Sequence, residues 1–224
     1  MTAAFCLIFD CDGTLVDSEP LLAEVLAETF TEAGFPFVPD DYMTTYRGVA
    51  FAHIVAALEE RHGQMDEAYR KTTEANMRSR LKARMSAALE AIDGIKDTLE
   101  ALDLPCCVAS NGPLAKIRLS LETTGLVDYF DDHLFSAYDV GIFKPDPGLY
   151  LHAGEAMGYA PERCIVIDDA AVGVAAGMNA GMHVVHLNRF AERETTPAGA
   201  HQIAHMHELP ALVRDIIATA SDER

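Results

Sequence analysis

Five short apolar runs constrain the fold of this chain more than any other feature of its sequence. The first, residues 4–9, is continuously apolar rather than alternating and stops at Asp10, as a strand buried on both faces of a parallel sheet does. Four later runs have the same character: residues 106–109, 133–135, 164–167 and 182–186. Helical spacing of apolar residues separates the runs, for example at Ile95, Leu99 and Leu102. Strands that alternate with helices predict an α/β fold with a doubly wound parallel sheet.

Residues 18–86 interrupt this alternation, because they contain helical patterns and no strand-like run. Ser18 followed by Pro20 is typical of a helix start. Apolar spacing predicts further helices around residues 54–58 and 69–81. We therefore expect residues 1–17 and 87–224 to form the α/β core and residues 18–86 to form an inserted α-helical domain, which suits a length of 224 residues.

The charge of the chain limits the ligands that it can attract. Acidic residues number 35 and basic residues 17, for a net charge of −18. This balance opposes nonspecific attraction to nucleic acid and to anionic membranes, so we expect neither as a partner. An anionic small-molecule substrate must therefore be met by local positive charge.

Targeting and redox signals favour a soluble, cytoplasmic protein. No apolar run reaches the roughly 18 residues of a membrane span, and the first four residues lack the basic start of a signal peptide. The five cysteines do not stand at metal-ligand spacing, so we expect reduced thiols. We expect a monomer. The role of Phe35, Phe37 and Phe51 remains open: they could form an interface or seal the inserted domain. Three histidines are expected in a C-terminal loop: His201, His205 and His207.

Side chains that carry chemistry lie after four of the apolar runs. Asp10 and Asp12 follow the first run, Ser110 and Asn111 the second, Lys144 the third, and Asp168 and Asp169 the fourth. Each alone also suits an ordinary turn or helix cap. The carboxyl ends of parallel strands meet at one edge of a sheet, so we expect these side chains to converge.

Four aspartates at one edge would repel one another, by roughly 4 kcal/mol for a pair 4 Å apart at an effective dielectric near 20. A cation must offset this repulsion. Carboxylate oxygens without histidine or cysteine select Mg²⁺, which usually takes substrate phosphate as a further ligand. The sequence therefore predicts a magnesium site that serves phosphoryl chemistry.

At these positions the chain resembles the haloacid dehalogenase (HAD) superfamily. Residues 10–14 read D-C-D-G-T, the D-x-D-G-T signature of its phosphatases, and all four family motifs occur in order. The resemblance implies a Rossmann-like core with a helical cap, which is the inserted domain. Within the family the chain is similar to sugar phosphatases close to β-phosphoglucomutase, in particular the type that acts on 6-phosphogluconate. Four segments carry this closer likeness: residues 9–19, 110–113, 135–139 and 144–147.

The resemblance also implies roles for the catalytic residues. Asp10 would be the nucleophile that forms an aspartyl phosphate, and Asp12 would protonate the leaving oxygen and then activate water. Ser110 and Lys144 would hold the phosphoryl oxygens.

Binding residues follow from the same resemblance. Backbone N–H groups near Gly13 and Asn111 would complete the phosphate cradle, and Arg47 in the insertion is a candidate contact for a substrate carboxylate or hydroxyl. The metal ligands would be Asp10, the backbone carbonyl of Asp12, Asp169 and, as a supporting or shared ligand, Asp168. Ala170 stands where many relatives have serine, which removes a hydroxyl near the metal.

The resemblance leaves three functions to compare. The similar phosphomutases carry an arginine three residues after the glycine of a Gly-Val pair, whereas Gly48-Val49 is here followed by Ala50-Phe51. We therefore expect a Mg²⁺-dependent phosphatase of phosphorylated sugars or sugar acids, with 6-phosphogluconate as the best guess for the substrate. A β-phosphoglucomutase-like phosphomutase is the alternative. A non-catalytic protein that binds a phosphate ligand is a more distant one.

Overall fold

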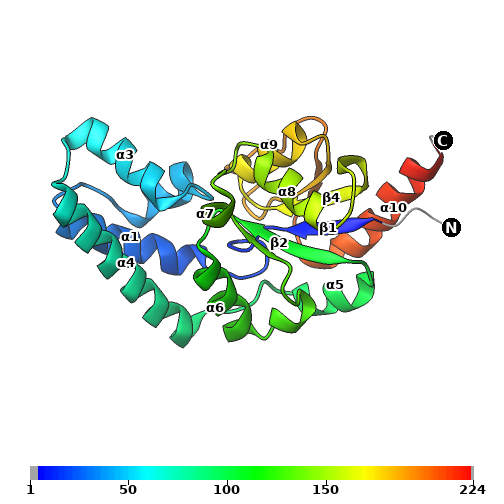
Figure 1. Cartoon of the computed structure of the whole chain (residues 1–224), viewed down its shortest axis with the longest axis horizontal. Coiled ribbons are helices and arrows are strands. Elements are labelled where there is room, and N and C mark those ends of the chain that lie inside the picture. Colours follow the sequence, from blue (N-terminus) through cyan, green and yellow to red (C-terminus); the bar gives the residue numbers. More distant parts are fainter. Residues whose placement is uncertain (1–4, 223–224) are drawn as a thin grey trace.

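The computed structural model describes residues 5–222 and contains a six-stranded sheet in which neighbouring strands are parallel (Figure 1). The strands are β1 Cys6–Phe9, β2 Cys106–Ser110, β3 Leu134–Ser136, β4 Cys164–Asp168, β5 His183–Leu187 and β6 His201–Ile203. Their order is β3-β2-β1-β4-β5-β6, so the direction of winding reverses between β1 and β4. The prediction of a doubly wound α/β fold is confirmed, and the reversal marks the place where such sheets bind ligands.

Helices cover both faces of this sheet. The core helices are α5 Ile95–Leu102, α6 Leu114–Thr124, α7 Ala137–Val140, α8 Gly148–Ala156, α9 Ala171–Asn179 and α10 Leu209–Asp222. Successive residues of β1 enter two separate apolar clusters: Leu7 lies in one with residues of α5, α6 and α10, and Ile8 in the other with residues of α8 and α9. Because both faces are buried, the strands read as continuous apolar runs.

The apolar pattern does not predict the edge strand β6. Only Ile203 of its three residues is buried, whereas His201 and Gln202 are exposed. The strand pairs with β5, with His201 opposite Val185. A strand with a single buried residue leaves no apolar run to detect, so the expectation of a loop at His201 is wrong.

The helices expected in residues 18–86 are present. They are α1 Glu19–Glu32, α2 Pro39–Asp41, α3 Phe51–His62 and α4 Glu67–Ala88, with a π-helical turn at Tyr42–Tyr46. They lie to one side of the core, at the left of Figure 1. Their interior is aromatic: the ring of Phe30 lies 6.5 Å from that of Phe35, 5.0 Å from Phe37 and 5.7 Å from Phe51. Phe35 and Phe37 are therefore interior residues of the insertion.

Two segments connect the insertion to the core, and they lie side by side. The N–H of Asp17 donates to the carbonyl of Glu90 at 2.9 Å, and Val16 pairs antiparallel with Ala91. Entry and exit are thus joined by backbone hydrogen bonds directly after the D-x-D-G-T turn. This junction fixes the insertion next to the carboxyl end of β1.

Among residues 5–222, no helix is long and apolar enough to cross a membrane. The five cysteines are free thiols, as expected. The first four residues, on which the expectation about a signal peptide depends, lie outside the described part of the chain.

Candidate active site

Strand ends bring the predicted catalytic side chains together. Asp10 follows β1, Asp168 ends β4 and Asp169 follows it, and one oxygen from each of the three carboxylates lies within 4.8 Å of the others. The ammonium of Lys144 lies 2.6 Å from Oδ1 of Asp10 and 2.8 Å from Oδ2 of Asp168. All four side chains are buried. The convergence expected from the sequence is therefore present.

Burial makes this cluster electrostatically unfavourable when no further cation is bound. The pKa of Asp10 is raised to about 8: burial raises it most, Lys144 opposes the rise, and the carboxylates of Asp168 and Asp169 add to it. Burial likewise raises the pKa of Asp169 to about 6, against the opposing effect of Arg47. Such a cluster of hard oxygen atoms fits a magnesium ion, because a divalent cation would stabilise the ionised carboxylates against the burial and the mutual repulsion that raise these pKa values.

Lys144 is positioned by the residues around it. The hydroxyl of Tyr150 donates to Oδ2 of Asp168 at 2.6 Å, and the ammonium lies 4.6 Å from the centre of the Tyr150 ring. Asn111 accepts the backbone N–H of Lys144 at 2.9 Å and donates to the carbonyl of Gly48 at 3.0 Å. The amide of Asn111 therefore connects the end of β2, the lysine segment and the insertion loop.

The carboxylate of Asp12 lies outside the three-aspartate cluster and has partners of its own. Its Oδ1 accepts the hydroxyl of Ser18 at 2.5 Å, and its Oδ2 pairs with the ammonium of Lys116 at 2.5 Å. Burial opposes ionisation of Asp12, but Lys116 and Ser18 outweigh it and lower the pKa of the carboxyl. Lys116 is not among the residues expected from the sequence, because its spacing is that of a surface lysine of α6. The one local signal is that this helix begins two residues after the Ser110-Asn111-Gly112 turn.

Gly13 allows Asp169 to approach the first motif. The glycine has φ +81°, and a Cβ at this position would lie 2.2 Å from Oδ2 of Asp169. Its own N–H donates to the carbonyl of Val16 at 2.8 Å, so this amide is engaged within the turn. Thr14 adds a hydrogen bond from its hydroxyl to Oδ1 of Asp169 at 2.9 Å. The D-x-D-G-T turn therefore holds the carboxylate of Asp169 in place.

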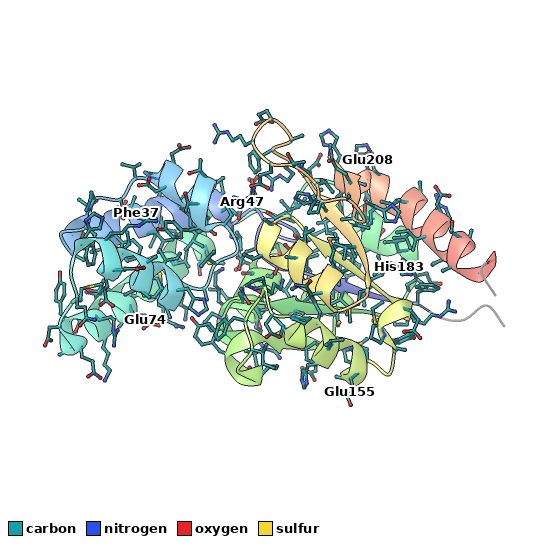
Figure 2. The ribbon with its side chains drawn as sticks, turned by 90° about the horizontal axis from the view of Figure 1, so that it is seen from above. Phe37, Arg47, Glu74, Glu155, His183 and Glu208 are labelled. Atoms are coloured by element: carbon teal, nitrogen blue, oxygen red, sulfur yellow. The ribbon has the colours of Figure 1, made fainter. Side chains whose placement is uncertain are left out.

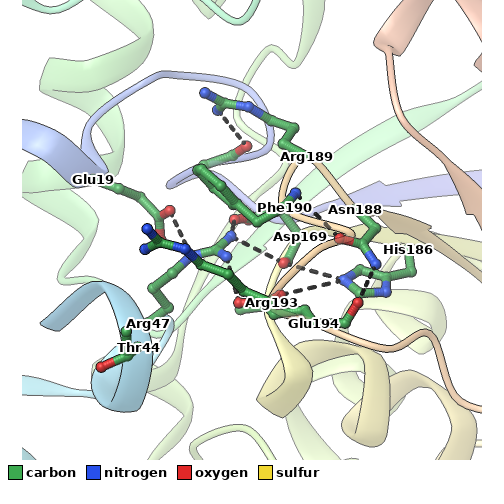
Figure 3. A network of polar contacts seen from close by, with 12 residues as sticks. Glu19, Thr44, Arg47, Asp169, His186, Asn188, Arg189, Phe190, Arg193 and Glu194 are labelled. Carbon is green, nitrogen blue, oxygen red and sulfur yellow. Dashed lines mark hydrogen bonds and ion pairs between the residues drawn. The ribbon is translucent and has the colours of Figure 1, made fainter. Parts of the chain in front are cut away.

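Arg47 lies between the insertion and the core, and it contacts acids of both (Figures 2 and 3). Its Nε donates to Glu19 at 2.7 Å and its Nη1 to Glu194 at 2.6 Å, while Nη2 pairs with the carboxylate of Asp169. The guanidinium also lies 4.7 Å from the centre of the Phe190 ring. The sequence predicts a substrate contact for Arg47, whereas the structure engages the guanidinium with carboxylates of the chain itself.

Gly48, next to Arg47, packs directly against the segment that follows β4. It has φ +71°, and a Cβ there would lie 2.8 Å from Cβ of Ala170 and 2.8 Å from Cγ2 of Val172. The alanine that replaces the serine of many relatives thus lies under the insertion loop.

A cleft of about 480 Å³ separates the insertion from the core. Its floor holds Asp10, Asp12 and Ser110. The insertion contributes its loop at residues 48–51 and the side of α4 that carries Met77, Arg78, Leu81, Lys82 and Met85. The core contributes α6 and Tyr138. The volume is that of a small-molecule site.

The haloacid dehalogenase-like hydrolase family matches residues 6–181, a span that contains the three-aspartate cluster, Lys144 and the whole insertion. The chain belongs to this family. It is 36% identical to the 6-phosphogluconate phosphatase of Escherichia coli (strain K12) over 186 residues, which cover 83% of each chain. This HAD hydrolase is therefore an enzyme, and the relative supports phosphatase chemistry.

Two solved structures of HAD proteins are also similar. A haloacid dehalogenase-like protein from Agrobacterium tumefaciens str. C58 is 29% identical, with a TM-score of 0.76, and the match covers 96% of this chain and 99% of that one. A HAD family hydrolase from Deinococcus radiodurans R1, solved with bound phosphate and sodium, is 26% identical, with a TM-score of 0.70 and coverage of 96% and 97%. The resemblance found in the sequence is confirmed.

Proposed function

We propose that this HAD hydrolase is a Mg²⁺-dependent phosphatase of small phosphorylated sugars or sugar acids, and that residues 18–86 are its cap. The observation that carries the proposal is the buried Asp10, which lies 2.6 Å from Lys144, belongs to the three-aspartate cluster and lines the floor of the cleft. A nucleophile, a neutralising lysine and a cation site at one strand end are the parts that phosphoryl transfer needs.

The metal would be held by oxygen ligands from three carboxylates, Asp10, Asp168 and Asp169, together with the backbone carbonyl of Asp12. When bound, Mg²⁺ would neutralise negative charge on the phosphoryl oxygens. Lys144 would hold another phosphoryl oxygen, and Ser110 would donate to a third. The N–H groups near Gly13 and Asn111 would complete the cradle.

Asp10 would attack phosphorus while the bond to the sugar oxygen breaks. The leaving oxygen would take a proton from Asp12, once the nearby anionic phosphate has raised the pKa of this carboxyl, which Lys116 and Ser18 lower in the free enzyme. The ionised Asp12 would then remove a proton from water, which attacks the aspartyl phosphate and releases inorganic phosphate. Ser18 and Lys116 each contact one oxygen of Asp12, so they would orient this carboxyl. Arg47 would position Asp169 rather than touch the substrate.

6-Phosphogluconate is the first substrate to test, because a relative 36% identical is the 6-phosphogluconate phosphatase of Escherichia coli. We would measure phosphate release with Mg²⁺ from 6-phosphogluconate, fructose 1-phosphate and both anomers of glucose 1-phosphate. We expect turnover that EDTA abolishes, that Mg²⁺ restores and that Asp10→Asn lacks. Interconversion of glucose phosphates without phosphate release would instead indicate a phosphomutase. No Asp10-dependent turnover of any compound would indicate a phosphate-binding protein.

A further inference from the structure

The wall of the cleft has the opposite charge balance from the chain as a whole. Acidic residues outnumber basic ones by 35 to 17 in the sequence. Beyond Asp10 and Asp12, however, the charged residues that line the cleft are four cations and one acid: Arg78, Lys82, Lys116, Arg118 and Glu122. A local excess of positive charge in an acidic protein favours an anion at that place.

The four cations differ in how far the chain neutralises them. Lys116 pairs with Asp12 at 2.5 Å, Arg78 with Glu74 at 2.5 Å, and Arg118 with Asp132 at 3.3 Å. Lys82 takes part in no ion pair or hydrogen bond within residues 5–222. Both arginines are partly exposed and Asp132 is almost fully exposed, so the two pairs are weak. Lys82 is thus the cation most available to a ligand.

These cations lie on two helices that border the cleft, α4 of the insertion and α6 of the core. Arg78 and Lys82 lie one helical turn apart on α4 of the insertion, and the Arg78 guanidinium lies 5.5 Å from the centre of the Tyr138 ring of the core. Arg118 shares one side of α6 with Ala115, Leu119 and Glu122, all of which line the cleft. α4 and α6 pack against each other, so both helices supply charge to the same space.

We propose that Lys82, with Arg118 and Arg78, forms a subsite for a carboxylate at the end of the substrate opposite its phosphate. This inference rests on the proposed function and makes the substrate a phosphorylated sugar acid rather than a neutral sugar phosphate. Arg47 is not available for the carboxylate, because its donors are engaged by Glu19, Asp169 and Glu194. Lys116 orients Asp12.

A carboxylate suits this wall better than a second phosphate. Two of the cations share their charge with Glu74 and Asp132, and Glu122 adds a negative charge to the same wall. A dianionic phosphate would face this acid, whereas a singly charged carboxylate is matched by Lys82. Glu122 instead suits the hydroxyls of a sugar chain, since an ionised carboxylate only accepts hydrogen bonds.

The test compares two acyclic substrates that differ at one end only: 6-phosphogluconate, which ends in a carboxylate, and glucitol 6-phosphate, which ends in a hydroxymethyl group. We expect the wild-type enzyme to favour 6-phosphogluconate at least tenfold in kcat/KM. Lys82→Gln should reduce kcat/KM for 6-phosphogluconate about tenfold, chiefly through KM, and change that for glucitol 6-phosphate less than twofold. Lys71→Gln is the matched control, because Lys71 lies on the same helix outside the cleft and pairs with Glu67.

The Asp10→Asn variant allows substrate binding to be measured without turnover. Its calorimetric Kd for 6-phosphogluconate should increase about tenfold when Lys82→Gln is added, whereas its Kd for glucitol 6-phosphate should stay the same. Equal losses on both substrates, or a wild-type enzyme with no preference for the carboxylate, would overturn the subsite while leaving the phosphatase intact. A preference for fructose 1,6-bisphosphate that Lys82→Gln removes would overturn the choice of a carboxylate. Absence of Asp10-dependent turnover on every compound would overturn the proposed function itself.

Discussion

Replacing Arg47 with methionine tests whether the arginine between insertion and core neutralises buried acids. Arg47→Met retains much of the apolar volume and removes the charge. Glu19 and Asp169, which are 2% and 1% exposed, would lose a direct cationic partner, whereas Glu194 reaches solvent. Breaking a buried ion pair from one side reduces the free energy of unfolding by about 3–5 kcal/mol. For a chain of this length that corresponds to a fall in Tm of about 6–20 °C.

The assay is urea unfolding of the metal-free protein, followed by circular dichroism at pH 8 and pH 5. The loss should be larger at pH 8, because burial already raises the pKa of Glu19 and Asp169 and removal of Arg47 raises both further. Their burial then costs more at a pH where the unfolded chain is ionised. Glu19→Gln added to Arg47→Met should recover about 1–3 kcal/mol by removing one uncompensated charge.

Arg84→Met is the matched control, since Arg84 also pairs with two glutamates, Glu24 and Glu28, but on the surface. It should reduce the free energy of unfolding by less than about 1 kcal/mol. Equal stabilities of Arg47→Met and Arg84→Met, or a double variant no more stable than Arg47→Met, would refute the role assigned to Arg47.

Three further predictions concern the site. Burial near other carboxylates holds the pKa of Asp10 at about 8, above its ordinary 3.8, so the folded metal-free protein binds a proton that the unfolded chain releases. The stability of the wild-type protein should therefore fall as the pH rises from about 4 to 8. In thermal melts, Asp10→Asn should show a smaller fall over the same range. At pH 8 its free energy of unfolding should exceed that of the wild type by about 1 kcal/mol or more. Gly13→Ala should displace the carboxylate of Asp169. A Mg²⁺ titration followed by thermal shift should then show at least tenfold weaker binding than in the wild type. Unchanged affinity would contradict the close approach of Asp169 to Gly13. Gly48→Ala should reduce the free energy of unfolding by about 1–2 kcal/mol and lower kcat/KM. The left-handed backbone at Gly48 and its contact with Ala170 both disfavour a side chain there. Urea curves and kinetics equal to those of the wild type would contradict this prediction.

The sequence predicts the sheet and the strand-end residues of the candidate site, because both depend on local signals. A buried parallel strand requires a continuous apolar run. β2 and β4 end at a polar residue of the site, and β1 ends immediately before one. The turn after β1 needs a positive φ, which the glycine of the first motif supplies. These features leave a trace within a few residues of the chain, whereas β6 with its single buried residue does not.

The partners of Arg47 and Lys116 could not be predicted in the same way. Arg47 is 122 residues from Asp169 and 147 from Glu194 in the sequence, and no local pattern reports such contacts. Lys116 lies on α6, where the buried residues are Ile117, Ser120 and Leu121. Its position relative to them in the sequence is that of a surface residue. Lys82 is similar, since only the packing of α4 near α6 turns its side of the helix toward the cleft.

Arg47 belongs to the insertion and Asp169 to the core, and this division links two equilibria. In the proposed function a divalent ion would share the Asp169 carboxylate with this guanidinium. By whatever factor binding of the ion changes the docking of the insertion loop on the core, docking of the loop must change ion binding by the same factor, because thermodynamic coupling is reciprocal. The metal affinity of this protein would therefore report how closely its insertion is docked, even when no substrate is bound.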